Sequence, residues 1–186
     1  MAVNAVVLLT DPDRPQAIPA ANYAREFFDV RQVQWHLRSE KRLREICAPA
    51  DYLLNFLSAP YVPSWERSKY RMAINFHPAP PEYPGVGSAS RALYDGRTEH
   101  GVTAHLMDDQ YDHGLILRIR RFPIENGWGY RQLFDRALDE SLLLFVDICR
   151  LLSSSILAPL RHVEWSGPAM TRRQFSAHPS FVEVAK

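Results

Sequence analysis

Residues 74–87 read INFHPAPPEYPGVG, and four of these fourteen positions are proline. The first four residues have the character of a strand. The prolines that follow exclude helix and the centre of a sheet, because proline has no amide hydrogen to donate and disfavours helix in the residue before it. In an extended strand, alternate residues point to the same side, so Asn75 and His77 project together while Ile74 and Phe76 can pack on the other face. The stretch predicts two polar side chains at the end of a strand, followed by a stiff segment.

Short apolar runs elsewhere in the chain predict the rest of the sheet. Residues 5–9 (AVVLL) and 52–57 (YLLNFL) are typical of strands buried on both faces of a parallel sheet. Residues 30–35 alternate apolar and polar side chains, which favours an edge strand. Further strands are predicted at 73–77, 102–107 and 115–122, and helices at 19–28, 39–46, 88–94 and 130–152. This alternation predicts an α/β fold with a mainly parallel sheet, in which ligands bind beyond the carboxyl ends of the strands.

The helix predicted at 130–152 has the clearest periodicity in the chain. Its apolar residues recur at steps of three and four, which marks a buried stripe: Phe134, Leu138, Leu142, Phe145, Cys149 and Leu152. The helix can pack on its own sheet or on a second subunit, and a homodimer is the expectation. A polar segment with little periodicity follows it. We therefore divide the chain into a catalytic domain, residues 1–152, and a C-terminal tail, residues 153–186, packed on the same domain.

Composition narrows the class of protein. The chain has 186 residues, of which 46% are hydrophobic and 23% charged, as expected for one globular domain. The net charge of +1 does not favour nucleic-acid binding as the main function. Cys47 and Cys149 have neither metal-binding nor redox spacing, so we expect reduced cysteines in a cytoplasmic protein. The N-terminal segment lacks the features of a signal peptide, and no apolar run is long enough to span a membrane.

The polar residues at the predicted strand end have the chemistry that acyl transfer to an amine requires. The amide of Asn75 can donate to an oxygen that gains negative charge, and His77 can take or give a proton near neutral pH. Asp112, in the segment DDQYDHG at 108–114, is a candidate to orient the histidine. A purely structural role for His77 stays open. His105 and His113 also permit a metal site, but no paired ligand spacing supports one, and we expect none.

These features together resemble the 10-formyltetrahydrofolate-dependent formyltransferase family, whose members act on methionyl-tRNA, glycinamide ribonucleotide or amino sugars. The resemblance covers residues 51–124 and rests on five ordered motifs: Asn75-Phe76-His77, the proline turn at 81–85, the predicted helix and turn at 88–96, Gly101-Val102-Thr103, and Asp112-His113-Gly114. It implies a Rossmann-like sheet flanked by helices. The family's catalytic Asn, His and Asp correspond to Asn75, His77 and Asp112.

The resemblance also implies 10-formyltetrahydrofolate as co-substrate, bound between two loops. The first loop would contribute Phe56, Leu57, Ser58, Tyr61 and Val62, and the second Met107, Asp108 and Asp109. Core packing is the competing interpretation for the apolar members of the first loop. The segment before Asn75 is shorter than is usual in the family and its first strand lacks a glycine-rich turn. This difference predicts either a sheet trimmed on its N-terminal side or folate contacts that come from elsewhere in the chain.

The proline segment and the tail segment WSGPAMTRRQF (165–175) are most similar to the sugar N-formyltransferases. This similarity implies a nucleotide-linked amino sugar as acceptor. In that case Arg172 and Arg173 would bind a diphosphate, an exposed Trp165 or Tyr83 would stack on the base or sugar, and Pro81 would shape the acceptor side. A tail that is only a strap over the domain is the competing interpretation. The near-neutral charge and the absence of a large C-terminal domain argue against a tRNA acceptor.

Three functions therefore remain open on sequence. The first is formyl transfer to the primary amine of a small acceptor, with methionyl-tRNA and glycinamide ribonucleotide as the alternative acceptor types. The second is hydrolysis of formyltetrahydrofolate, which uses a similar triad with water as acceptor. The third is a folate-binding homologue without turnover.

Overall fold

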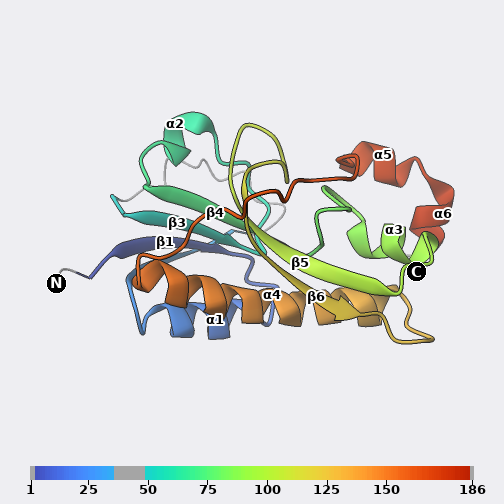
Figure 1. Cartoon of the computed structure of the whole chain (residues 1–186), viewed down its shortest axis with the longest axis horizontal. Coiled ribbons are helices and arrows are strands. Elements are labelled where there is room, and N and C mark those ends of the chain that lie inside the picture. Colours follow the sequence, from blue (N-terminus) through green and yellow to red (C-terminus); the bar gives the residue numbers. More distant parts are fainter. Residues whose placement is uncertain (1–2, 36–48, 185–186) are drawn as a thin grey trace.

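The sheet in the computed structural model, which describes residues 3–35 and 49–184, has six strands in the order β2-β1-β3-β4-β5-β6 (Figure 1). The pairs among β2, β1, β3 and β4 are parallel, whereas β5 and β6 are added antiparallel. The mainly parallel α/β prediction is confirmed, and β2 lies at an edge, as predicted. The strands are β1 (Ala5–Thr10), β2 (Asp29–Gln34), β3 (Tyr52–Phe56), β4 (Met72–His77), β5 (Glu99–Leu106) and β6 (Ile116–Pro123).

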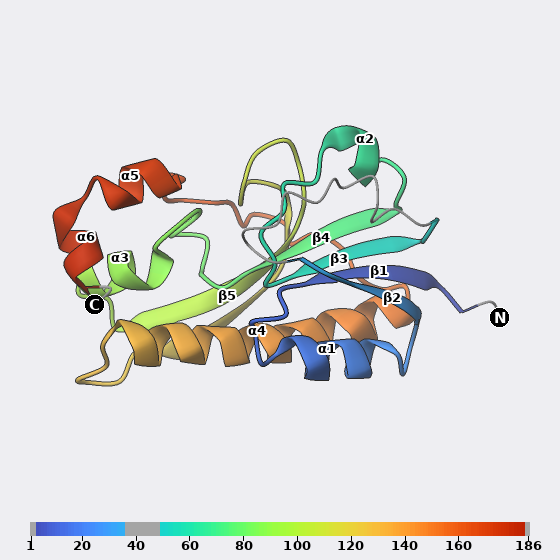
Figure 2. The same ribbon diagram turned by 180° about the vertical axis from the view of Figure 1, so that it is seen from behind.

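Helices cover the sheet unevenly. Figures 1 and 2 show α1 and α4 on one face, α2 on the opposite side, and α3, α5 and α6 gathered at one end of the molecule. The predicted helices at 88–94 and 130–152 are confirmed, and α1 begins two residues before the predicted start. The predicted helix at 39–46 and Cys47 lie outside the described residues. The helices are α1 (Ala17–Ala24), α2 (Ser64–Arg67), α3 (Ser88–Tyr94), α4 (Tyr130–Ser153), α5 (Arg172–Ser176) and α6 (Pro179–Val184).

The alternation of side chains along β4 determines where the polar residues point. Ile74 and Phe76 are buried in the larger core, on the face that α4 covers. The Phe145 ring of α4 lies 4.8 Å from the Phe56 ring and 5.1 Å from the Phe76 ring, between centroids. The long helix therefore packs on its own sheet, directly beneath the ends of β3 and β4. Because neighbouring strand residues point to opposite faces, Asn75 and His77 face away from this aromatic cluster.

The tail crosses the sheet and is joined by backbone hydrogen bonds to the proline-rich segment. Ser166 N donates to the Pro81 carbonyl oxygen at 3.1 Å, and Val86 N donates to the Met170 carbonyl oxygen at 2.8 Å. Gly85 has φ +81°, and a Cβ there would lie 2.2 Å from the Met170 oxygen. The close approach therefore requires glycine. The tail also contains the short helices α5 and α6, which the polar sequence did not predict.

No helix within residues 3–35 and 49–184 combines the length and apolar character needed to cross a membrane.

Candidate active site

A cleft of about 860 Å³ lies beyond the carboxyl ends of the parallel strands. Asn55, Asn75 and His77 line it from the ends of β3 and β4, together with His105 of β5. The walls come from six other parts of the chain: the segment after β1, the loop after β3, the proline-rich segment after β4, the β5–β6 loop, α4 and the tail. The site predicted at the end of β4 therefore opens into the larger of the two cavities described here.

The carboxylate of Asp112 lies between the two histidines of the cleft and is close to both. One carboxylate oxygen lies 3.2 Å from His77 Nδ1, and the other lies 3.4 Å from His105 Nε2. Gly85 N also donates to the carboxylate, at 2.9 Å. Asp112 has φ 47°, and a Cβ on Gly114 would lie 1.9 Å from the Leu106 oxygen, so the loop turns tightly back toward the sheet. The structure thus brings together the predicted histidine and carboxylate.

Burial and charge act in opposite directions on the Asp112 carboxyl. Burial raises its pKa, but the nearby His77 charge, the hydrogen bond and charge of His105 and the Gly85 amide outweigh burial, and the pKa falls to about 2. Asp112 is therefore ionised at neutral pH, as an orienting carboxylate must be.

Asn75 presents its amino end to this carboxylate. Asn75 Nδ2 lies 3.0 Å from His105 Nε2 and 3.3 Å from Asp112 Oδ1. His105 Nδ1 faces the carbonyl oxygen of Leu106 at 2.9 Å, and its Nε2 faces both Asn75 and Asp112. On its other side, Asn75 Oδ1 accepts from Asn55 Nδ2 at 2.9 Å. Every polar atom of the Asn75 amide therefore has a partner.

His77 is held between two oxygens. Its Nδ1 faces Asp112, and its Nε2 lies 3.0 Å from the backbone oxygen of Tyr83. Each ring nitrogen therefore faces an oxygen, one on a carboxylate and one on a backbone carbonyl.

Sequence reasoning missed two residues of this network. His105 was considered only as a possible metal ligand, although it is the register partner of Asn75 across β4 and β5. Asn55 was included only as part of an apolar strand, although it is the register partner of Asn75 across β3 and β4. The available signal was one amide in the run YLLNF, which an ordinary core strand does not need.

Most residues predicted to bind the co-substrate line the cleft: Leu57, Ser58, Tyr61, Val62, Met107 and Asp108. Phe56 does not, because its fully buried ring belongs to the core beneath the strand ends. Asp109 is also absent from the lining and pairs with Arg67 instead. Tyr111, which was not predicted, lines the cleft and lies 5.7 Å from the Tyr61 ring.

The residues predicted to bind the acceptor do not share one environment. Arg172 lines the cleft, whereas Arg173 does not. The indole nitrogen of Trp165 donates to the Gly114 oxygen at 2.9 Å, and its ring lies 5.0 Å from the His105 ring and 5.9 Å from the His77 ring. Trp165 thus packs against both histidines rather than lining the cleft.

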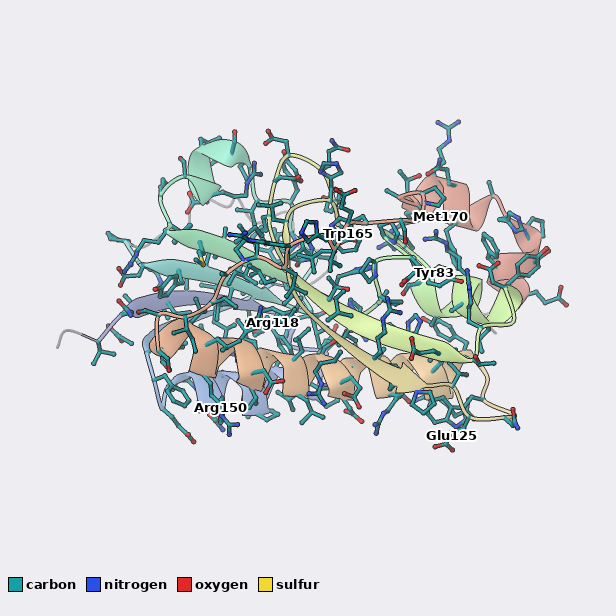
Figure 3. All side chains as sticks on the ribbon, viewed as in Figure 1. Tyr83, Arg118, Glu125, Arg150, Trp165 and Met170 are labelled. Atoms are coloured by element: carbon teal, nitrogen blue, oxygen red, sulfur yellow. The ribbon has the colours of Figure 1, made fainter. Side chains whose placement is uncertain are left out.

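The expectation of an exposed Tyr83 is wrong. Its ring is only 4% exposed, and its hydroxyl donates to Asp95 at 2.7 Å and accepts from Arg97 at 2.9 Å. Tyr83 lines a second cavity of about 400 Å³, and Met170 lines both this cavity and the cleft. Pro81 is also buried, with its carbonyl oxygen bound to the tail. Figure 3 shows Trp165 and Met170 on the tail, with Tyr83 beside α3.

Within the part of the chain that the structure describes, no group of three or more histidine, cysteine and acidic side chains has the arrangement of a metal site.

The low pKa of Asp112 predicts acid sensitivity. The folded-state value of about 2 lies below the ordinary 3.8, so the ionised carboxylate stabilises the fold at higher pH. This contribution is lost as the pH falls from about 4 through about 2. The urea midpoint of Asp112→Asn should therefore vary less over this range than that of the unmodified chain. Equal slopes for the two proteins would contradict the assignment.

Comparison with known proteins gives the family. The family model described as Formyl transferase matches residues 45–148, more than half of the chain. Methionyl-tRNA formyltransferase from Listeria monocytogenes serotype 4a is 32% identical over 141 residues, which cover 70% of this chain and 45% of that protein. The chain spans about half or less of the length of the curated relatives that it matches.

Solved structures show the same fold at lower identity. A 4-N formyltransferase from Francisella tularensis aligns with TM-score 0.78 and 14% identity, covering 94% of this chain and 79% of that one. An N-formyltransferase from Helicobacter canadensis, in complex with folinic acid and dTDP-3-aminofucose, aligns with TM-score 0.72 and 16% identity, covering 93% and 72%. The motifs, the sheet order and the family match agree: the chain belongs to the formyl transferase family.

Proposed function

We propose that this protein transfers a formyl group from 10-formyltetrahydrofolate to the primary amine of a small acceptor, a nucleotide-linked amino sugar. The observation that carries the proposal is the meeting of Asn75, His77 and Asp112 at the base of one cleft, in a chain of this family. A homodimer and a cytoplasmic location both stay predictions.

The cleft fits a folate-sized ligand. Its volume of about 860 Å³ lies within the usual range for small-molecule sites. Two buried acceptors on residues of its wall, Asn55 Oδ1 and Ser58 Oγ, have no partner among the described residues. Buried acceptors of this kind suit a heterocycle that carries N–H donors, such as a pterin. When bound, the folate would supply the activated formyl group, and the loops after β3 and β5 would hold its ring.

The chain's own residues have distinct roles in this proposal. Asn75 Nδ2 would turn from His105 and Asp112 toward the formyl oxygen as that oxygen gains negative charge. His77 would accept a proton from the attacking amine and then return one to the leaving nitrogen. Because Nε2 lies against the Tyr83 carbonyl oxygen, the ring must leave that contact to act as base. Asp112 would stabilise the charge that the ring gains when it accepts the proton.

One assay separates the three functions that remain open. The protein is incubated with 10-formyltetrahydrofolate, with and without a panel of amino-sugar nucleotides, and tetrahydrofolate is measured. Release that depends on an acceptor supports transfer, and release without acceptor indicates hydrolysis. Absence of release with every acceptor, together with folate binding, would indicate a non-catalytic homologue and contradict the proposal. Methionyl-tRNA and glycinamide ribonucleotide belong in the panel, since curated relatives include enzymes for methionyl-tRNA and purine biosynthesis.

Two neighbouring arginines on the tail provide a matched test of the acceptor class. Arg172 lines the cleft and Arg173 does not, although both are exposed residues at the start of α5. If the acceptor carries a diphosphate, Arg172→Ala should raise the KM for the acceptor roughly tenfold or more, because charge-assisted hydrogen bonds to the phosphate are lost. The KM for the folate should not change, and the effect should shrink in high salt. Arg173→Ala is the control, and equal KM values for both variants would contradict a phosphate contact at Arg172.

A further inference from the structure

Asn55 is the direct neighbour of Asn75 in the parallel pair of β3 and β4, and its side chain is buried. Its Nδ2 donates two hydrogen bonds, one to Asn75 Oδ1 at 2.9 Å and one to the backbone oxygen of Ser58 at 3.1 Å. A backbone carbonyl can only accept, so the end of the Asn55 amide that faces it must be the amino end. The Ser58 contact therefore decides how Asn55 is oriented.

The orientation of Asn55 is passed on to Asn75. The two ends of an asparagine amide have nearly the same shape, and only hydrogen bonding distinguishes them. Because Asn55 offers N–H, Asn75 must turn its carbonyl oxygen toward Asn55 and its amino group toward His105 and Asp112. We propose that Asn55 is a positioning residue that sets the direction of the Asn75 amide, an inference that rests on the oxyanion-binding role proposed for Asn75.

The direction of this amide matters most during the reaction. The amino end of Asn75 can stabilise an oxygen that gains negative charge, whereas the carbonyl end would repel it. His105 and Asp112 hold the same amino group in the resting structure, but those contacts must lengthen when the group meets a substrate oxygen. Asn55 lies on the other side of Asn75 and can keep its hydrogen bond. It is thus the contact that can hold the amide in place when the other two are released.

The composition of β3 supports a role beyond packing. Every residue of the strand is buried, and the other four are apolar or aromatic. Asn55 also carries a buried Oδ1 without a partner among the described residues, which is unfavourable for the fold. A leucine or valine at this position would avoid the unpaired acceptor.

The variant Asn55→Asp replaces the amino end with an oxygen at almost unchanged shape. The carboxylate would face two acceptors, the Ser58 oxygen and Asn75 Oδ1, and would favour a reversed Asn75 amide. We expect kcat to fall ~10²-fold, approaching the loss for Asn75→Ala. The KM for the folate should stay within about threefold of the unmodified value, because Asn55→Asp keeps the Oδ1 acceptor on the cleft wall that is proposed to face the folate. Asn22→Asp, the same change on the exposed side of α1, is the control and should be neutral.

A double-mutant cycle separates positioning from general structural damage. In the Asn75→Ala background, Asn55→Asp should cause no further loss of kcat, because its effect passes through the missing amide. Asn55→Ala, which introduces no charge, should lower kcat roughly tenfold alone and not at all in that background. It keeps the test open should Asn55→Asp fail to fold. Equal losses in both backgrounds would overturn the proposal.

A readout without turnover distinguishes this inference from the proposed function. In ¹⁵N-labelled protein, the side-chain amide of Asn75 is assigned by its absence in Asn75→Ala. We expect nuclear Overhauser contacts from this amide to the ring protons of His105, and their loss in Asn55→Asp. If no acceptor supports turnover, the proposed function fails while this measurement still stands. If the contacts persist unchanged in Asn55→Asp, the positioning role is wrong.

Discussion

Replacing His77 with alanine is expected to lower kcat by ~10²–10⁴, the usual contribution of a general acid or base. The Nδ1 atom of His77 lies 3.2 Å from the ionised carboxylate of Asp112, which would stabilise the ring when it takes a proton. Its removal leaves the amine without a group to take its proton. The folate affinity should change little, because the imidazole ring of His77 is itself buried at the base of the cleft. Steady-state release of tetrahydrofolate gives kcat, and calorimetry with a folate analogue gives the affinity.

His162→Asn is the matched control for this substitution. His162 is exposed on the tail with φ 64°, a backbone conformation that asparagine tolerates, so this variant should keep full activity. Activity of His77→Ala within about tenfold of the unmodified chain would rule out general acid–base catalysis by His77.

For Asn75→Ala we expect a loss of ~10²–10³ in kcat, the range measured when one oxyanion donor is removed. The donor is the amino group now bound to His105 and Asp112. Because it stabilises charge that develops only during the reaction, the KM for the folate should stay nearly constant. Asn126→Ala, an exposed change in the loop before α4, is the control. Equal increases in KM and decreases in kcat/KM, with kcat unchanged, would instead identify Asn75 as a binding residue.

Combining substitutions tests whether these residues act as one unit. The losses for Asn75→Ala, His77→Ala and Asp112→Asn together should be far smaller than the product of the three single losses. Their side chains contact one another directly, so removal of one already disables the others. Losses that multiply would show three independent contributions.

The sequence predicted the position of the site better than its inner network. The run of residues 74–77 alternates in such a way that Asn75 and His77 must share a face, and the apolar runs of β1 and β3 predict the parallel sheet around them. Local patterns of this kind depend only on neighbouring residues. The partners of Asn75 depend instead on strand register, which brings together positions 20 and 30 residues away. Asn55 and His105 were missed for that reason.

The contacts of the tail were likewise not predictable from local sequence patterns. Its polar composition predicts exposure, and α5 and α6 are indeed without buried residues. But the backbone of the tail pairs with the proline-rich segment and helps to enclose Tyr83. The residues around Tyr83 in the sequence give no sign that this side chain is buried. Trp165 likewise stands in a polar segment and packs on two histidines distant in sequence.

The central claim is that this cleft moves a formyl group to an amine, and the fate of the formyl carbon tests it most directly. The chain is incubated with 10-formyltetrahydrofolate labelled with ¹³C in the formyl group and with the amino-sugar nucleotide that best stimulates release. We predict that the label appears as an amide on the acceptor nitrogen, and that His77→Ala suppresses this product. Label recovered as formate, or label that stays on the folate with every acceptor offered, would contradict the account.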